Sequence, residues 1–235
     1  MGVEVIDLGI AKDDAVEFEA RLSTRLMDRP CDTIIITRAV SMGKFDFAGA
    51  AIKKMGAKTC FHEVGITPGH LVLFANLPTF RIEGQPKIGN ITPPISPMPE
   101  HRSVEPSKRA FFGLSGYPVA SAVCLGFLVI PYLRALHSIQ PLKARRFAKL
   151  KCSGNFSLDT MEQRKVTKPK HLQAFWQEKL ILQGREVKIS ADQSSHKIRP
   201  LLESNCWIGV SAGKESVEDG EEVEVFEMYP RSLGM

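Results

Sequence analysis

The sequence predicts an α/β fold, with a doubly wound, mostly parallel sheet followed by a small all-β, barrel-like domain. Two observations carry this prediction. Over residues 1–140, strand-like and helix-like patterns alternate, which is typical of helices packed on both faces of one sheet. Over residues 141–235, short apolar stretches separated by glycine and serine replace that alternation, which favours a β domain.

The first strand and helix are read from apolar spacing. Residues 3–8 (VEVIDL) form a short apolar run that ends at Gly9, as a strand would. Residues 13–27 then carry apolar side chains at three- and four-residue steps, the spacing of a helix with one buried face. Asp13 or Asp14 precedes this pattern, and an aspartate there can cap the free amides of the first helical turn.

A second strand and a second helix follow. Residues 32–37 (DTIIIT) are apolar and β-branched on both faces, which indicates a strand buried on two sides, as in a parallel sheet. A loop over residues 38–43 leads into a helix over about residues 44–55. Gly56 ends this helix, because glycine readily adopts the left-handed conformation of a helix terminus.

Further strands and one further helix complete the α/β domain. They are expected at residues 61–66, 71–74, 111–114 and 119–135. Residues 78–108 interrupt the alternation, since they hold seven prolines and little apolar periodicity. This stretch lies between two expected strands, so we interpret it as a long insertion in the domain and not as a domain boundary.

One apolar stretch has the length of a membrane span. Residues 114–133 carry no charged side chain. Pro118 lies where a helix would begin and Pro131 lies near where it would end, which indicates a helix over about residues 119–135. We interpret this helix as a buried element of the α/β domain and expect no membrane association.

The β domain is expected to consist of short strands. The stretches that predict them are residues 180–182, 186–189, 207–210 and 222–227. In the last stretch Glu222 and Glu224 alternate with Val223 and Val225, so the acidic and apolar side chains point to opposite faces. Such alternation is typical of a strand with one face in a core.

Composition limits the class of partner. Hydrophobic residues make up 43% and charged residues 24% of the chain, an ordinary globular balance. The formal net charge of +5 is mildly basic, but no dense stripe of lysine and arginine with interleaved aromatics is present. We therefore expect no nucleic-acid partner, and the charge also suits small anionic ligands.

Cysteine usage and the first residues indicate the compartment. The five cysteines are odd in number, widely spaced and never in a C-x-x-C pair, which argues against a disulfide framework and a zinc site. The first residues, MGVEVIDLGIAKDD, do not have the pattern of a secretory signal. A reducing, cytoplasmic location fits these features best.

Two loops follow strands at the sheet edge where ligands bind in open α/β folds. They are residues 37–43 (TRAVSMG) and residues 113–118 (GLSGYP). Each leads into the N-terminus of a helix, whose free amides and partial positive charge suit a phosphate group. The same pattern also occurs in plain connections, so both interpretations remain open at this point.

Three further polar positions are candidates for chemistry. Asp46 lies near the first loop, where a carboxylate can hold a hard cation such as Mg²⁺ or simply favour the helix start. His70 belongs to a Pro-Gly-His turn that places it at the same end of the sheet, although turn chemistry alone explains the motif. His62 has no second histidine at metal-ligand spacing, which favours a structural role.

Taken together, these residues resemble the molybdopterin molybdenumtransferases, the family of bacterial MoeA and the E domain of animal gephyrin. The resemblance is carried by residues 2–10 (GVEVIDLGI), by residues 32–74 with ITRAVSMGKFDF and GITPGHLVLF, and by residues 111–136 with FFGLSGYPVASAV. It fades over residues 137–197 and returns weakly at residues 202–225, which look like the family's C-terminal β-barrel. It implies that the α/β domain is a MoaB/Mog-type molybdopterin-binding domain.

The resemblance also implies an activity and a site. Proteins of this family insert molybdate into molybdopterin, usually in adenylylated form, with the help of Mg²⁺, and act as homodimers. By resemblance, Asp46 would be the catalytic residue and the metal ligand. The residues expected to bind the cofactor are Arg38, Ser41, Gly43, Gly69, His70, Gly116 and Pro118.

Three departures from the family pattern bear on activity. Arg38 and Ala39 stand where the family has two glycines, which let backbone amides approach a phosphate closely. Residues 67–71 (TPGHL) lack both lysines of the family's K-P-G-K-P, and residues 113–120 lack an amide and a hydroxyl of G-x-P-G-N-P-V-S.

The alternative function is therefore a degenerate, non-catalytic homologue that acts as a binding or scaffold module. An adenylyltransferase of the related MogA type is a third reading, against which the V-S-M-G form and the barrel-like tail argue.

The start of the chain also departs from the family. Met1 falls inside the family's α/β domain, which has a further strand and helix before the segment that resembles residues 2–10. Three explanations fit this start: a fragment of an open reading frame, a misplaced start codon, or a separately encoded N-terminal half that acts with this chain. A sheet that lacks one strand has unpaired edges, which invite association.

Overall fold

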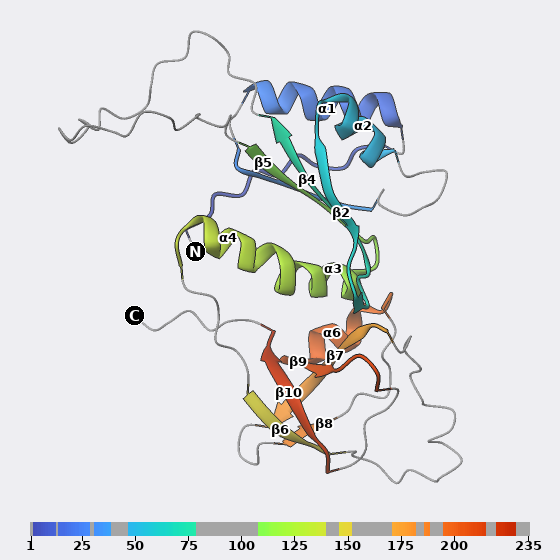
Figure 1. Cartoon of the computed structure of the whole chain (residues 1–235), viewed down its shortest axis with the longest axis vertical. Helices are drawn as coiled ribbons and strands as arrows, with labels where there is room; N and C mark the ends of the chain where they lie inside the picture. The colour runs from blue at the N-terminus through green and yellow to red at the C-terminus, as the bar shows by residue number, and fades with distance from the viewer. Residues whose placement is uncertain are drawn as a thin grey trace, which may run out of the picture.

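The structure, a computed structural model, comprises an α/β domain and a β-barrel domain (Figure 1). It describes residues 2–12, 14–28, 31–38, 47–78, 108–139, 146–151, 171–181, 186–188, 195–214 and 220–228. Three sequence predictions fall outside these ranges: those for loop residues 39–46, for the insertion over residues 79–107 and for the domain boundary near residue 140.

The first domain is built on a mixed sheet in the strand order β1-β5-β4-β2. The strands are β1 (Thr33–Thr37), β2 (Lys58–Glu63), β4 (Leu71–Pro78) and β5 (Lys108–Leu114). β1 and β5 are parallel, whereas β4 is antiparallel to both β5 and β2. The expected α/β class is confirmed, but the expectation of a mostly parallel sheet is wrong for the described strands. Pro78 pairs directly with Lys108, so β4 and β5 are neighbouring antiparallel strands and not the parallel pair that a doubly wound sheet would have.

The strand expected over residues 3–8 is not formed. These residues have no regular secondary structure, and Val5 and the following Ile10 are 85% and 92% exposed. A strand needs a neighbour for its backbone hydrogen bonds, and no described strand pairs with this segment. Arg21 holds the segment's end in place, since its guanidinium donates hydrogen bonds to the carbonyl oxygens of Leu8 and Ile10.

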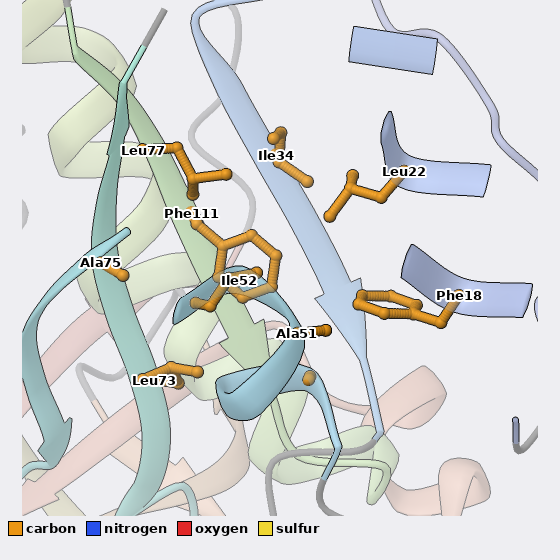
Figure 2. Close-up of a cluster of buried hydrophobic side chains, with 10 residues drawn as sticks. Phe18, Leu22, Ile34, Ala51, Ile52, Leu73, Ala75, Leu77 and Phe111 are labelled. Atoms are coloured by element: carbon orange, nitrogen blue, oxygen red, sulfur yellow. The ribbon is translucent and has the colours of Figure 1, made fainter. Parts of the chain in front are cut away.

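One face of the sheet is covered by α1 (Ala15–Asp28) and α2 (Ala48–Lys54). Asp14 caps α1 as expected, because its carboxylate accepts hydrogen bonds of 2.8 Å from the amides of Val16 and Glu17. Figure 2 shows the core beneath the two helices. Its buried residues are Phe18, Leu22, Ile34, Ala48, Ala51, Ile52, Leu73, Ala75, Leu77 and Phe111.

The end of α2 follows the sequence prediction, and its start does not. Gly56 has a φ of +82° and its amide donates to the carbonyl of Lys53, so it closes the helix terminus as expected. The helix was expected from about residue 44, but Phe47 is its N-cap and Ala48 its first residue.

β1 is an edge strand and is not buried on both faces. Ile34 is 5% exposed and packs beneath α1 and α2, whereas Ile35 on the opposite face is 43% exposed. The helix on that second face packs against β4 and β5 and does not bury Ile35. The parallel pairing of β1 was predicted correctly, and its two-sided burial was not.

The second face of the sheet is covered by one continuous helix of three parts. They are α3 (Pro118–Cys124), a π-helical turn η1 (Leu125–Val129) and α4 (Ile130–Leu136). The sheet-side cluster comprises Val72, Ala110, Phe112, Leu114, Cys124 and Val129. The helix was expected to be buried, and α3 is, but α4 contributes no fully buried residue. By length and composition the helix could also cross a membrane, and a core helix of a globular domain meets the same criteria.

The second domain is a closed barrel, as predicted. Its strands are β6 (Arg146–Lys151), β7 (Gln173–Ile181), β8 (Glu186–Lys188), β9 (Cys206–Val210) and β10 (Glu222–Glu227). They pair in the order β7-β8-β6-β10-β9, and β9 pairs back to β7 and closes the ring. Val223 and Val225 are 4% and 1% exposed and lie in the barrel core, which confirms the alternation expected in β10.

The two domains are joined by backbone pairing and by aromatic packing. β3 (Ile66–Thr67), which lies in sequence between β2 and β4, pairs in parallel with Gln173 and Ala174 of β7. Phe127 of the π-helical turn stacks on Phe175 of β7, with ring centroids 4.0 Å apart, and contacts Phe226 edge-on. The barrel is therefore packed directly against the helix that covers the sheet (Figure 1).

Candidate functional site

Three connections come together at one edge of the first sheet. Thr37 ends β1 directly opposite Leu114 at the end of β5, so Arg38, the one described residue of the loop after β1, lies beside the loop after β5. β4 runs antiparallel to β5 and starts at Leu71, which brings the turn of Gly69 and His70 to the same edge. The expectation that these loops share one end of the sheet is confirmed.

Arg38 is the first residue of the first loop and has an unusual backbone. Its φ is +69°, in the left-handed region that glycine favours, and its amide donates a 3.0 Å hydrogen bond to the carbonyl of Leu114. A Cβ built on Gly116 would lie 3.2 Å from Cγ of Arg38, so the arginine stem lies against that glycine. The side chain is exposed and makes no hydrogen bond or ion pair within the described part of the chain.

The second loop is tied down by its own polar groups. The amide of Tyr117 donates to the hydroxyl of Ser115 at 3.2 Å, and the hydroxyl of Ser121 donates to the carbonyl of Ser115. Pro118 occupies the first turn of α3, where its missing N–H costs nothing. Together these contacts fix the loop between β5 and α3.

The amides at the start of α3 are less available than the sequence implies. The amide of Val119 donates a 3.2 Å hydrogen bond to the carbonyl of Ser195, which precedes α6 (Ile198–Glu203) in the barrel domain. One of the donors expected to face a phosphate is therefore taken by the chain itself. No sequence pattern predicted this contact, because Ser195 lies where the family resemblance fades.

Gly69 has a packing role that its sequence context did not indicate. Its φ is +108°, and an added Cβ would lie 2.8 Å from Sγ of Cys124 and 3.2 Å from the carbonyl oxygen of Ala120. The thiol of Cys124 donates to the carbonyl of Gly69 at 3.3 Å, and burial raises the pKa of this thiol to about 11. Gly69 thus lets the turn lie directly against α3.

His70 sits beside this turn and faces solvent. Its side chain is exposed, and its carbonyl accepts a 2.9 Å hydrogen bond from the amide of Val64. The imidazole is thus free to face a ligand at the sheet edge, while the backbone holds the turn.

The remaining predicted site residues are Ser41, Gly43 and Asp46, and all three lie outside the described residues. Among the residues that the structure does describe, no group of three or more His, Cys, Asp or Glu side chains could hold a metal ion. The structure thus brings together Arg38, Gly69, His70, Gly116 and Pro118, and leaves the other three as sequence predictions.

Comparison with known families gives two matches that divide the chain as the fold does. Residues 1–135 match the family described as "Probable molybdopterin binding domain". Residues 162–228 match the family described as "MoeA C-terminal region (domain IV)". The first match covers more than half of the chain and contains the three loops at the sheet edge.

Two named relatives and two solved structures agree with these matches. Molybdopterin molybdenumtransferases of Synechococcus elongatus and Haemophilus influenzae are 28% and 27% identical, over 96% and 98% of this chain. The chain spans about half of their length, 45% and 47% respectively. A MoeA protein of Pyrococcus horikoshii has a TM-score of 0.63 at 19% identity, and covers 95% of this chain with 43% of its own. A molybdenum cofactor biosynthesis protein of Pyrococcus furiosus has a TM-score of 0.57 at 18% identity, with 93% and 56% covered.

Proposed function

Because the chain belongs to the molybdopterin-binding domain family and carries the C-terminal portion of a MoeA-type protein, we propose that it acts in molybdenum cofactor biosynthesis by inserting molybdate into adenylylated molybdopterin. The observation that supports this most is the position of Arg38 against Gly116, at the sheet edge where the loop after β5 and the turn before β4 also lie. Ligands of open α/β folds bind at this edge.

The proposed site combines charge, backbone donors and one carboxylate. Ser41 and Gly43 contact phosphate, and Gly116 and Pro118 shape the second loop. Asp46 is the proposed catalytic residue and metal ligand, since Mg²⁺ is commonly held by one or two carboxylates together with substrate phosphates. A Mg²⁺ ion held by Asp46 would supply positive charge to the nucleotide phosphate that is released.

The turn between β3 and β4 completes the site. Gly69 holds this turn against α3, and the exposed His70 presents a donor at the same edge. Molybdopterin and molybdate are both anionic, so a site without the family's two lysines at residues 67–71 needs positive charge from another position.

A titration with molybdopterin and its adenylylated form, with and without Mg²⁺ and molybdate, tests the proposal. We expect saturable binding that is lost in Asp46→Ala and weakened in Ser41→Ala. Glu222→Ala is the matched control, because Glu222 is an exposed acid on β10 of the barrel, away from the sheet edge. If the folded, unsubstituted chain binds neither form of molybdopterin, then this chain is not an enzyme that acts alone.

The second candidate function is a non-catalytic binding or scaffold module. Two observations favour it: the chain lacks the family's two lysines near Gly69, and the carbonyl of Ser195 occupies the amide of Val119. Such a module would fold and associate with a partner protein but would leave molybdate uninserted. A turnover assay on protein that binds molybdopterin separates the two functions.

We further propose a cytoplasmic homodimer that works with a polypeptide corresponding to the remaining half of the relatives. The outer edge of β1 pairs with no described strand, and Val5 and Ile10 of the segment before α1 are exposed, so backbone groups on one element and apolar side chains on the other are available to a partner. The described cysteines Cys31, Cys60, Cys124 and Cys206 are all free thiols, as a reducing compartment favours.

A further inference from the structure

Arg38 occupies a backbone conformation that its side chain does not favour. Of the described non-glycine residues, only Arg38 and Ser138 have a positive φ, and Arg38 is the one at the sheet edge where the loops meet. An L-residue in this region brings its Cβ too close to the following carbonyl, which glycine avoids and asparagine tolerates. Residues held this way cluster at functional sites, where the surrounding structure imposes the conformation.

The conformational strain at Arg38 is not offset by contacts of its guanidinium group. Its stem lies against Gly116, where a Cβ would come within 3.2 Å of Cγ and 3.6 Å of Cβ of the arginine. Its guanidinium is exposed and unpaired within the described residues. No described contact of the head group therefore explains why arginine stands at a position that favours glycine. The unpaired charge remains as the explanation for the arginine.

The fold gives this charge a defined position. The amide of Arg38 is bonded to the carbonyl of Leu114, and Thr37 pairs with Leu114 in the parallel ladder. The arginine is thereby anchored at the carboxyl ends of both β1 and β5. Gly116 has no side chain to push the stem away, so the head group projects from a fixed base beside the second loop.

We propose that Arg38 is a specificity-determining residue whose guanidinium binds a tetrahedral oxyanion, either the phosphate of molybdopterin or molybdate itself. A planar guanidinium donates two parallel hydrogen bonds to such an oxyanion and remains charged at any working pH. The chain thus recognises its anion through one charged side chain, where the family uses the backbone amides of a glycine-rich loop. This inference rests on the function proposed above and goes beyond it by assigning the charge that selects the ligand.

Three substitutions separate the charge from the backbone conformation. Arg38→Gly removes the charge and the conformational cost, Arg38→Ala removes the charge but keeps the cost, and Arg38→Lys keeps a charge without the planar fork. Each variant is titrated with molybdopterin, with its dephosphorylated form and with sodium molybdate, and its melting temperature is recorded. Comparison of the three ligands distinguishes the two oxyanions. If Arg38 binds the phosphate, the substitutions weaken binding of molybdopterin but not of its dephosphorylated form; if it binds molybdate, they weaken binding of molybdate.

We expect Arg38→Gly and Arg38→Ala to bind the recognised anion about ten- to a hundred-fold more weakly, since hydrogen bonds to charged groups carry effects of this size. Arg38→Lys should retain an intermediate affinity that falls more steeply with salt. Arg38→Gly should also melt about 2–4 °C above Arg38→Ala, because it alone removes the strain. Loss of binding with a gain in stability is the signature of a residue retained for its ligand.

The outcomes are distinguishable. Unchanged or tighter binding by Arg38→Gly, in a background where the unsubstituted chain binds, overturns the role of Arg38 and leaves the proposed function standing. Failure of the unsubstituted, folded chain to bind any of the probes overturns the proposed function itself. A lower melting temperature for Arg38→Gly than for Arg38→Ala contradicts the strain argument and assigns Arg38 to loop packing.

Discussion

Gly69 illustrates, at the scale of single residues, how a turn is fitted against a helix. We predict that Gly69→Ala destabilises the protein by about 2–4 kcal/mol, because the substitution combines a positive φ with a forced contact. The new Cβ would lie 2.8 Å from Sγ of Cys124 and 3.2 Å from the carbonyl oxygen of Ala120. Urea unfolding followed by circular dichroism measures the loss.

The double variant Gly69→Ala/Cys124→Ala is the control for this contact. Removing the sulfur relieves the shorter of the two contacts and leaves the backbone strain, so stability should recover in part. Equal destabilisation in the single and the double variant would show that the backbone conformation alone sets the cost.

Two buried thiols predict how stability depends on alkaline pH. Burial raises the pKa of Cys124 to about 11, and burial together with the charge of Glu178 raises the pKa of Cys206 to about 12, from an ordinary value of 9.0. Below pH 9 both thiols are neutral in either state and their contribution is complete. As the pH rises toward 11 and 12, ionisation in the unfolded state lowers stability by up to about 1.4 kcal/mol per unit per thiol.

Unfolding free energies measured between pH 8 and pH 10.5 check this prediction. Cys124→Ala and Cys206→Ala should each flatten the alkaline decline, whereas Cys60→Ala should not, because Cys60 is exposed. A decline of the same slope in all three variants would assign the effect to other groups.

Sequence reasoning was strongest where a residue acts locally. Asp14 caps the start of α1 and Gly56 closes the end of α2, each through contacts with its own neighbours in the chain, and both were predicted. The side-chain contact between Arg38 and Gly116, and the bond from Val119 to Ser195, join residues far apart in the chain. No local sequence pattern records such contacts, so this part of the site geometry is visible only in the fold.

At the scale of elements, the π-helical turn of the long helix joins the two domains. We predict that Phe127→Ala costs about 2–4 kcal/mol and separates the unfolding of the barrel from that of the α/β domain. Phe127 stacks on Phe175 and contacts Phe226, and these rings connect the helix to the barrel strands. Phe127→Leu, which keeps most of the apolar volume, should cost less.

The chain contains its own probe for this experiment. Its only two tryptophans, Trp176 and Trp207, both lie in the barrel, so tryptophan fluorescence reports barrel unfolding while helical circular dichroism reports the first domain. Coincident transitions in Phe127→Ala would contradict the assigned role of this ring.

Element types were easier to predict than their pairing. The helix after Pro118 and the strand at residues 222–227 were placed almost residue by residue, because periodicity and proline position define them. The expected strand at residues 3–8 has the right composition but no neighbour, and composition alone does not supply a hydrogen-bonding partner. The antiparallel return of β4 and β5 was likewise invisible to periodicity.

At the scale of the whole molecule, the edge of β1 that no described strand covers predicts association. We expect concentration-dependent self-association that Ile35→Lys reduces, because a lysine on an exposed edge strand opposes strand pairing. Ile35 is 43% exposed on β1, and Ile181, at 40%, is an equally exposed isoleucine on β7. Ile181→Lys is therefore the matched control, and sedimentation velocity measures both variants.

A similar reduction by both lysines would indicate a general charge effect and not an interface at β1. The closed ring of the barrel offers fewer free strand edges than the first sheet, so we expect the two variants to differ.

The two-domain plan was predictable, because the alternation of strand-like and helix-like patterns gives way to short apolar stretches separated by glycine and serine. The joint between the domains was not, because β3 is only two residues long.

The direct pairing of Pro78 with Lys108 makes the join between β4 and β5 a natural place to edit the chain. The sheet requires only that these two positions meet, and lengthening a connection costs about 0.6 kcal/mol for each doubling. A short turn, a reporter domain or a new pair of termini placed here would leave the strand order unchanged. In a circular permutant, the present termini would be linked and the chain would instead begin and end between β4 and β5. Comparing its folding with that of the original chain would show how much folding depends on the order of the elements along the chain, since the sheet itself is the same in both.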